Sequence, residues 1–64
     1  MDEREKIMRY FEYAHLPEPM QQVSRPFCEL AERIHETLSR NAERSVALRK
    51  LLEAKDAAVR ASMP

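Results

Sequence analysis

Hydrophobic positions recur with the period of an α-helix in three stretches of this chain. In the first stretch, Ile7, Tyr10, Phe11 and Ala14 follow the i, i+3, i+4, i+7 spacing that places side chains on one helix face. Acidic residues in the first turn favour a helix here because they interact with the positive end of its dipole. The pattern predicts a short N-terminal helix over about residues 2–14.

Two prolines interrupt the helical pattern after this stretch. Pro17 and Pro19 disfavour a helix and favour an extended backbone, so residues 15–23 are predicted to form a linker. The linker carries apolar side chains at Leu16, Met20 and Val23, which we expect to pack on neighbouring structure.

The second predicted helix spans residues 25–38. Ser24 is a favourable N-cap residue, and Pro26 would stand in the first turn, where a missing N–H costs nothing. The apolar stripe of this helix consists of Phe27, Leu30, Ala31, Ile34 and Leu38.

The third predicted helix spans residues 42–62, with Asn41 as its N-cap. One of its stripes consists of Leu48, Leu51, Leu52, Lys55 and Val59. A second stripe, of mostly small residues, consists of Ala47, Leu51, Ala54, Ala58 and Ala61. We expect one stripe to face the second helix and the other to face another subunit.

The predicted fold is therefore all-α, a single domain with a short N-terminal helix, a proline-containing linker and a long antiparallel helical hairpin. A chain of 64 residues buries a marginal core, which disulfides, metals or oligomerisation usually supplement. One cysteine excludes an intrachain disulfide, and one Cys with two distant His residues does not form a structural zinc site. Oligomerisation is the remedy that remains.

Composition excludes several classes of function. The 11 basic and 11 acidic residues balance, which is unlike a general nucleic-acid binder. Glycine is absent, which excludes Gly-rich phosphate-binding loops. No apolar run is long enough to span a membrane, and the charged N-terminus is unlike a secretory signal peptide. We expect a protein that stays in the reducing cytoplasm where it is made.

The most informative polar motif is Ser24-Arg25-Pro26. A helix N-terminus offers unpaired N–H groups to an anion, and an arginine fork matches phosphate oxygens. The motif alone nevertheless favours a plain capping turn with a solvated Arg25. Tyr10, Phe11 and Tyr13 could stack on bases, although core packing is the simpler interpretation for Phe11.

No set of residues predicts catalysis. His15 and His35 lack a neighbouring nucleophile and carboxylate in sequence, and Cys28 is most simply a small buried apolar residue. We therefore expect no enzyme activity, no metal and no cofactor.

Two long blocks resemble a known family. The block RPFCELAE at residues 25–32, with Tyr10-Phe11 and His15-Leu16-Pro17 before it, and the block LRKLLEAKDAAVRA at residues 48–61 resemble phage anti-CBASS sponge proteins. The resemblance covers nearly the whole chain, and a related hairpin domain occurs in anti-Thoeris sponges.

The resemblance implies a function, an assembly and a set of site residues. Such sponges act in the cytoplasm of the infected bacterium, where they bind cyclic dinucleotides and trinucleotides without cleaving them and so block CBASS signalling. They form hexamers with dinucleotide pockets between paired protomers and trinucleotide sites near the threefold axis. By this analogy Tyr10 stacks on a base and Arg25 pairs with phosphate, where many relatives carry lysine.

The analogy extends less specifically to other residues. Phe11, Ser24 and Pro26 would border the same dinucleotide pocket, and Phe27 and Arg60 are candidates for the trinucleotide site. Two alternatives stay open at this point: a helical adaptor that binds another protein and no nucleotide, and a small enzyme that degrades the cyclic nucleotide.

Overall fold

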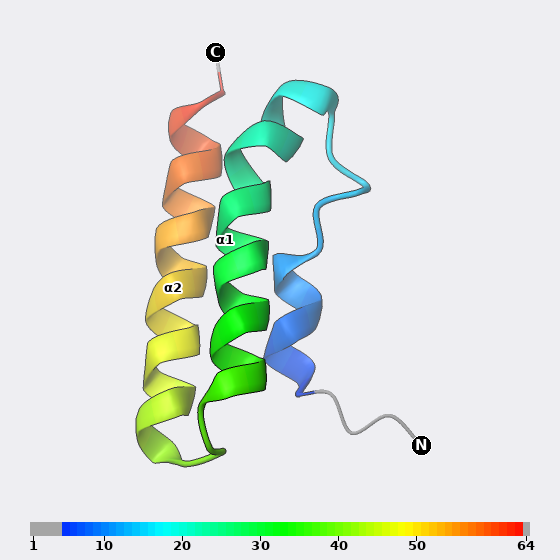
Figure 1. Ribbon diagram of the computed structural model, residues 1–64. Helices are drawn as coiled ribbons and strands as arrows, with labels where there is room; N and C mark the ends of the chain where they lie inside the picture. Colours follow the sequence, from blue (N-terminus) through cyan, green and yellow to red (C-terminus); the bar gives the residue numbers. More distant parts are fainter. Residues whose placement is uncertain (1–4, 64) are drawn as a thin grey trace.

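The computed structural model describes residues 5–63, and every regular element in this range is helical. A 3-10 helix, η1 (Lys6–Phe11), is followed by two α-helices, α1 (Glu18–Thr37) and α2 (Ala42–Ala61). The two α-helices form an antiparallel hairpin, and η1 lies beside α1 (Figure 1). It contacts both α1 and α2. The prediction of an all-α fold built on a long helical pair is confirmed.

The first element is shorter and more tightly wound than predicted. The residues of the expected helix that precede Glu5 lie outside the described residues, and η1 ends at Phe11 instead of reaching Ala14. Its inward side chains are Met8 and Phe11, both fully buried, whereas Tyr10 is 65% exposed. A 3-10 helix has three residues per turn, so every third side chain faces the same way. This period, and not the α-helical period, decides which face is buried.

The second helix begins seven residues earlier than predicted, at Glu18 instead of Arg25. Pro17 immediately precedes α1, and Pro19 stands in its first turn, where the N–H it lacks would have no intrahelical partner. Both prolines are therefore compatible with this helix start. The connection from η1 to α1 is limited to residues 12–17.

A glutamine side chain fastens this connection to the helix. The Nε2 atom of Gln21 donates to the carbonyl oxygen of Leu16 at 2.9 Å and to that of Ala14 at 3.3 Å. The extended linker predicted for residues 15–23 is thus replaced by a short loop that is hydrogen-bonded to the first turn of α1.

The prediction that Ser24 caps the second helix was wrong. Ser24 lies inside α1 and is fully buried, and its hydroxyl has no hydrogen-bond partner. Pro26 also lies inside the helix, where it cannot donate to the carbonyl of Gln22. The earlier start adds turns that partly bury Met20 and Val23, so hydrophobic packing outweighs the local capping signal.

The start of α2 agrees with the sequence prediction. The Oδ1 atom of Asn41 accepts a hydrogen bond from the backbone N–H of Arg44 at 2.9 Å, as an N-cap does. Leu48 and Lys55 are buried, as the first apolar stripe predicts. Along the second stripe Ala54 and Ala61 are exposed in the single protomer, so neither α1 nor η1 covers this face completely.

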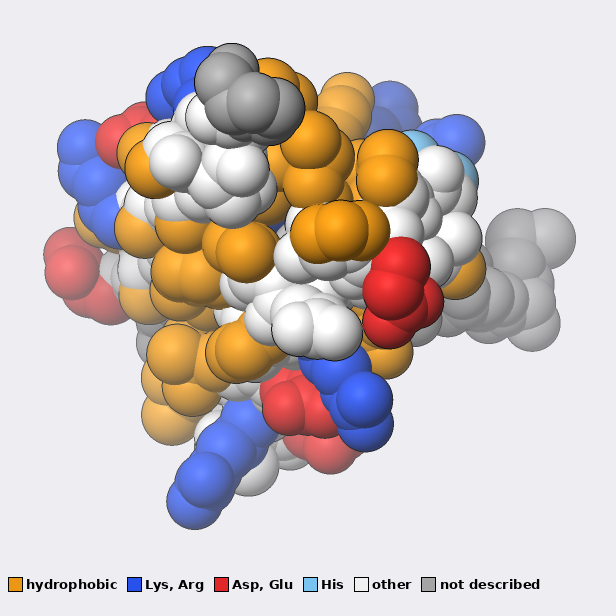
Figure 2. All heavy atoms as spheres, turned by 90° about the horizontal axis from the view of Figure 1, so that it is seen from above, with side chains coloured by type: hydrophobic (Ala, Val, Ile, Leu, Met, Phe, Trp, Pro, Cys, Tyr) orange, Lys and Arg blue, Asp and Glu red, His pale blue; other side chains and the backbone are white. Residues whose placement is uncertain are grey.

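The core is small. The buried apolar residues among those described are Met8, Phe11, Ala31 and Leu48. Viewed from the end where α1 begins, apolar side chains also gather at the surface between charged ones (Figure 2). Large hydrophobic side chains remain exposed at Leu30, Leu38, Val46 and Met63. No helix within the described range is both long and apolar enough to cross a membrane.

Candidate functional site

A cleft beside Tyr10, here called the Tyr10 cleft, is the strongest candidate site. It has a volume of about 350 Å³ and lies between η1 with its following loop and the last turns of α2. Its lining consists of Arg9, Tyr10, Glu12, His15, Leu16, Lys55, Asp56, Val59 and Arg60. Residues from both ends of the chain therefore meet in one protomer.

The lining of the Tyr10 cleft combines an aromatic ring with an excess of positive charge. Arg9, Lys55 and Arg60 outnumber the two carboxylates, Glu12 and Asp56, so the cleft has one net positive charge when His15 is neutral. The phenol ring of Tyr10 is largely exposed beside these cations. This arrangement suits a ligand with a planar base and a phosphate.

Lys55 is the most constrained cation of the cleft. Its side chain is 11% exposed, and its ammonium lies 2.9 Å from the Oδ1 atom of Asp56. The aliphatic stem of a lysine can pack on apolar surface while its charged end reaches the solvent. Leu16 and Val59 provide apolar surface in the same cleft.

Arg25 lies outside the Tyr10 cleft. Its guanidinium is exposed and donates from Nε to the Oε2 atom of Glu29, one helical turn away, at 3.0 Å. That hydrogen bond, the charge of Glu29 and a weaker effect of Tyr13 raise the pKa of Arg25, so it is a cation at every physiological pH. An exposed pair of this kind contributes little to stability, so an incoming anion can displace Glu29 at small cost.

Tyr13 lines a second cleft, which lies between the loop and α1. Its volume is about 460 Å³, and Ala14, His15, Cys28 and Glu32 contribute to its lining. Two carboxylates, Glu12 and Glu32, face this space. It is therefore less suited to an anion than the Tyr10 cleft.

The structure separates the residues that sequence reasoning grouped at the dinucleotide site. Phe11 is buried in the core, Ser24 is buried inside α1, and Pro26 is exposed within α1. Because α1 begins at Glu18, the backbone N–H groups around Ser24 are not those of a helix N-terminus. The helix-end argument for an anion site there was wrong, and Arg25 remains as an exposed side chain.

The two residues suggested for a trinucleotide site also lie in different environments. Arg60 is exposed and lines the Tyr10 cleft. Phe27 is half-buried and packs against the core. Arg60 is thus available to a ligand in the cleft, whereas Phe27 supports the hairpin from within.

Sequence reasoning missed Arg9 and Lys55 as cleft residues. The position of Lys55 in an apolar helical stripe could have indicated a functional role, because a lysine is rarely buried without a partner. Arg9 carried none, because its direction depends on the 3-10 winding of η1.

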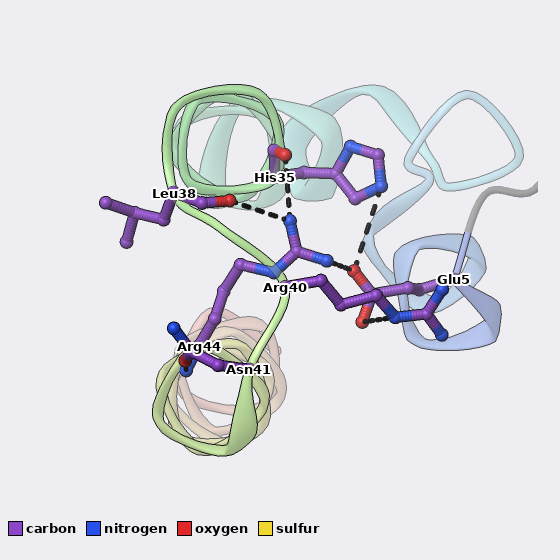
Figure 3. Close-up of polar contacts among 6 residues, drawn as sticks. All are labelled: Glu5, His35, Leu38, Arg40, Asn41 and Arg44. Atoms are coloured by element: carbon purple, nitrogen blue, oxygen red, sulfur yellow. Dashed lines mark hydrogen bonds and ion pairs between the residues drawn. The ribbon is translucent and has the colours of Figure 1, made fainter.

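Polar residues where η1, α1 and α2 meet form a second feature that the sequence did not reveal. The carboxylate of Glu5 accepts a hydrogen bond from Nη2 of Arg44, and both side chains are almost completely buried (Figure 3). This cluster lies apart from the Tyr10 cleft and connects the beginning of η1 to the hairpin.

Among residues 5–63, no group of three potential His, Cys, Asp or Glu metal ligands comes together. A scan against protein-family models and searches of curated proteins and of solved structures find no match to this chain. The case for a function therefore rests on the residues themselves and on the sequence resemblance described above.

Proposed function

We propose that this protein binds cyclic oligonucleotide second messengers and sequesters them without cleavage. In this account it is a phage sponge that works in the cytoplasm of the infected bacterium and blocks CBASS signalling there. The observation that carries the proposal is the Tyr10 cleft, in which an exposed aromatic ring lies beside Arg9, Lys55 and Arg60. The resemblance of the two sequence blocks to sponge proteins supports the same ligand class.

The bases and phosphates of a cyclic dinucleotide match the side chains of Tyr10 and Arg25. A cyclic dinucleotide presents two bases and two phosphates related by an approximate twofold axis. Stacking of a base on an aromatic side chain contributes about 1–3 kcal/mol. Arginine pairs with phosphate through two parallel hydrogen bonds. Tyr10 supplies the ring, and Arg25 supplies a guanidinium whose one described partner is an exposed carboxylate.

Two protomers are needed for the complete dinucleotide site in this account. Tyr10 lies in the cleft beside the end of α2, whereas Arg25 lies outside that cleft on α1. A twofold interface presents each of them twice, so two bases and two phosphates each find a partner. A hexamer with twofold and threefold axes would also offer a site of threefold symmetry, for which Arg60 is the candidate phosphate ligand.

Removal of Arg25 tests its role in the site. Hydrogen bonds to charged groups contribute about 1.5–3 kcal/mol, so Arg25→Ala should weaken binding of 3′,3′-cyclic GMP–AMP by at least about tenfold. Arg33→Ala, which removes another exposed arginine of α1, is the matched control and should bind normally. Titration calorimetry measures both variants, and an unchanged affinity of Arg25→Ala would remove that residue from the site.

The stripe of mostly small residues on α2 is exposed at Ala54 and Ala61 and provides a test of assembly. Ala54 is exposed in the protomer and Ala58 is half-buried. If the stripe packs against another subunit, the larger side chain in Ala54→Leu should destabilise that contact by about 1–3 kcal/mol. The fraction of protein in the oligomer should then fall. Glu53→Leu, the adjacent exposed position, controls for added hydrophobicity. Light scattering that still shows the full oligomer for Ala54→Leu would exclude the stripe as an interface.

A protein-binding adaptor is the second candidate function. The exposed side chains of Leu30, Leu38, Val46 and Met63 favour it, because such groups commonly contact a partner helix. An adaptor would show no nucleotide binding. An enzyme that degrades the ligand is distinguished by denaturing the complex and recovering the ligand, which a sponge returns intact.

A further inference from the structure

The carboxylate of Glu5 lies where the start of η1, the end of α1 and the start of α2 meet (Figure 3). Its Oε1 atom accepts from Nη2 of Arg44 and lies 3.8 Å from Nε2 of His35. Its Oε2 atom lies 3.8 Å from Nε of Arg40. The Glu5 side chain is 10% exposed, so this contact is shielded from solvent more than a surface ion pair.

The guanidinium of Arg44 is held in place by hydrogen bonds that do not involve Glu5. Its Nη1 atom donates to the carbonyl oxygen of His35 at 2.9 Å and to that of Leu38 at 3.1 Å, at the end of α1. Its side chain is 6% exposed. Because the guanidinium is planar and rigid, anchoring Nη1 also sets the direction of Nη2. Glu5 therefore binds to a donor that the hairpin holds in place.

The winding of η1 transmits this contact to the Tyr10 cleft. Side chains three residues apart nearly eclipse in a 3-10 helix. Met8 and Phe11 thus form one row that faces the hairpin, while Tyr10 and Arg9 belong to the two other rows. Glu5, the N-cap residue directly before η1, contacts the hairpin through Arg44. Fixing the rotation of the first row fixes the directions of the other two. Met8 and Phe11 hold η1 by hydrophobic contact, which has no directional preference of its own.

We propose that Glu5 and Arg44 are positioning residues, which set the rotation of η1 so that Tyr10 and Arg9 face the ligand-binding cleft. The ligand-binding part of this inference rests on the proposed function. The positioning of Tyr10 is independent of the proposed function, because it is a property of the protein without ligand. The two parts are therefore measured separately.

The test uses Glu5→Gln, which keeps an acceptor oxygen and removes the charge. The full chain is labelled with 3-fluorotyrosine, and the Tyr10 signal in the ¹⁹F NMR spectrum is assigned by its loss in Tyr10→Phe. In the unliganded protein, Glu5→Gln should move the Tyr10 resonance toward the chemical shift of 3-fluorotyrosine in the unfolded chain. The apparent affinity scales with the fraction of molecules in which η1 has the binding-competent orientation. If that fraction falls to one tenth in Glu5→Gln, the affinity for 3′,3′-cyclic GMP–AMP falls about tenfold.

Glu53→Gln is the matched control, since it neutralises an exposed carboxylate of α2 that contacts Lys50 at 3.7 Å. It should leave both the resonance and the affinity unchanged. A Tyr10 resonance and an affinity in Glu5→Gln equal to those of the original protein would overturn the proposal. If Glu5→Gln does not fold by circular dichroism, Glu5→Asp is measured in the same way, and its failure to change either quantity also overturns it.

The outcomes keep the two proposals apart. A shifted Tyr10 resonance together with no ligand binding by the unaltered protein supports the positioning role and contradicts the sponge function. Normal ligand binding with an unmoved resonance in Glu5→Gln supports the sponge function and contradicts the positioning role.

Discussion

Replacing Arg44 by methionine should destabilise the fold by about 3–5 kcal/mol, because it removes the buried hydrogen-bond donor of Glu5 and leaves that carboxylate only its longer contacts with His35 and Arg40. The partners left behind are the carboxylate of Glu5 and the carbonyl oxygens of His35 and Leu38. Small domains have stabilities near the lower end of about 5–15 kcal/mol, so most of the margin would be lost.

Thermal unfolding followed by circular dichroism measures this loss. At about 4 °C per kcal/mol for a domain of this size, 3 kcal/mol lowers the Tm by about 12 °C or more. Protein concentration must be the same for all variants, because assembly adds to apparent stability. Arg40→Ala is the matched control: its side chain is 68% exposed, and its contact with Glu5 should contribute less than about 1 kcal/mol. Equal Tm values for the two variants would show that Arg44 is not a buried anchor.

Replacing Phe11 by alanine should cost about 3–5 kcal/mol, as truncation of a fully buried phenylalanine does. Phe11 is the largest fully buried side chain of the described residues, and it holds the end of η1 against the hairpin. Its loss leaves a cavity between η1, which has six residues, and the hairpin. Urea denaturation gives the change in the free energy of unfolding, and a loss below about 1 kcal/mol would contradict the assigned packing.

The neighbouring tyrosine gives the opposite pattern and serves as the control. Tyr10 is 65% exposed, so Tyr10→Ala should leave the free energy of unfolding nearly unchanged. Under the proposed function the same substitution removes both stacking rings of a twofold site and should weaken ligand binding by at least about fivefold. Phe11→Ala thus tests core packing, and Tyr10→Ala at the adjacent position tests ligand recognition.

Hydrophobic periodicity was sufficient to predict the hairpin but not the winding of η1. The stripe from Leu48 to Val59 and the N-cap at Asn41 depend on spacing within one helix, and both were predicted correctly. The inward face of η1 was predicted only in part: Phe11 is buried as expected, whereas Tyr10 is exposed and the buried Met8 was missed, because the period is set by packing against both helices. The stacking role of Tyr10 was inferred from its type and from the family resemblance, and it stays a prediction; its side chain is 65% exposed.

The start of α1 shows why local signals can mislead. Ser24 followed by Pro26 has the composition of a helix N-terminus, yet Pro17 and Pro19 allow an earlier one. The Glu5–Arg44 contact joins residues 39 positions apart, so no pattern within one segment could indicate it. Lys55 and Arg60 could be placed on one helix from sequence, but the cleft they share with Tyr10 depends on how η1 docks.

Under the proposed function this protein binds a cyclic oligonucleotide and keeps it intact. Titration calorimetry of the full chain with 3′,3′-cyclic GMP–AMP, followed by denaturation and chromatography of the released ligand, tests it most directly. We expect tight binding with about one ligand per two chains and quantitative recovery of uncleaved ligand. Absence of binding to this ligand and to cyclic triadenylate, or recovery of a cleaved product, would contradict it.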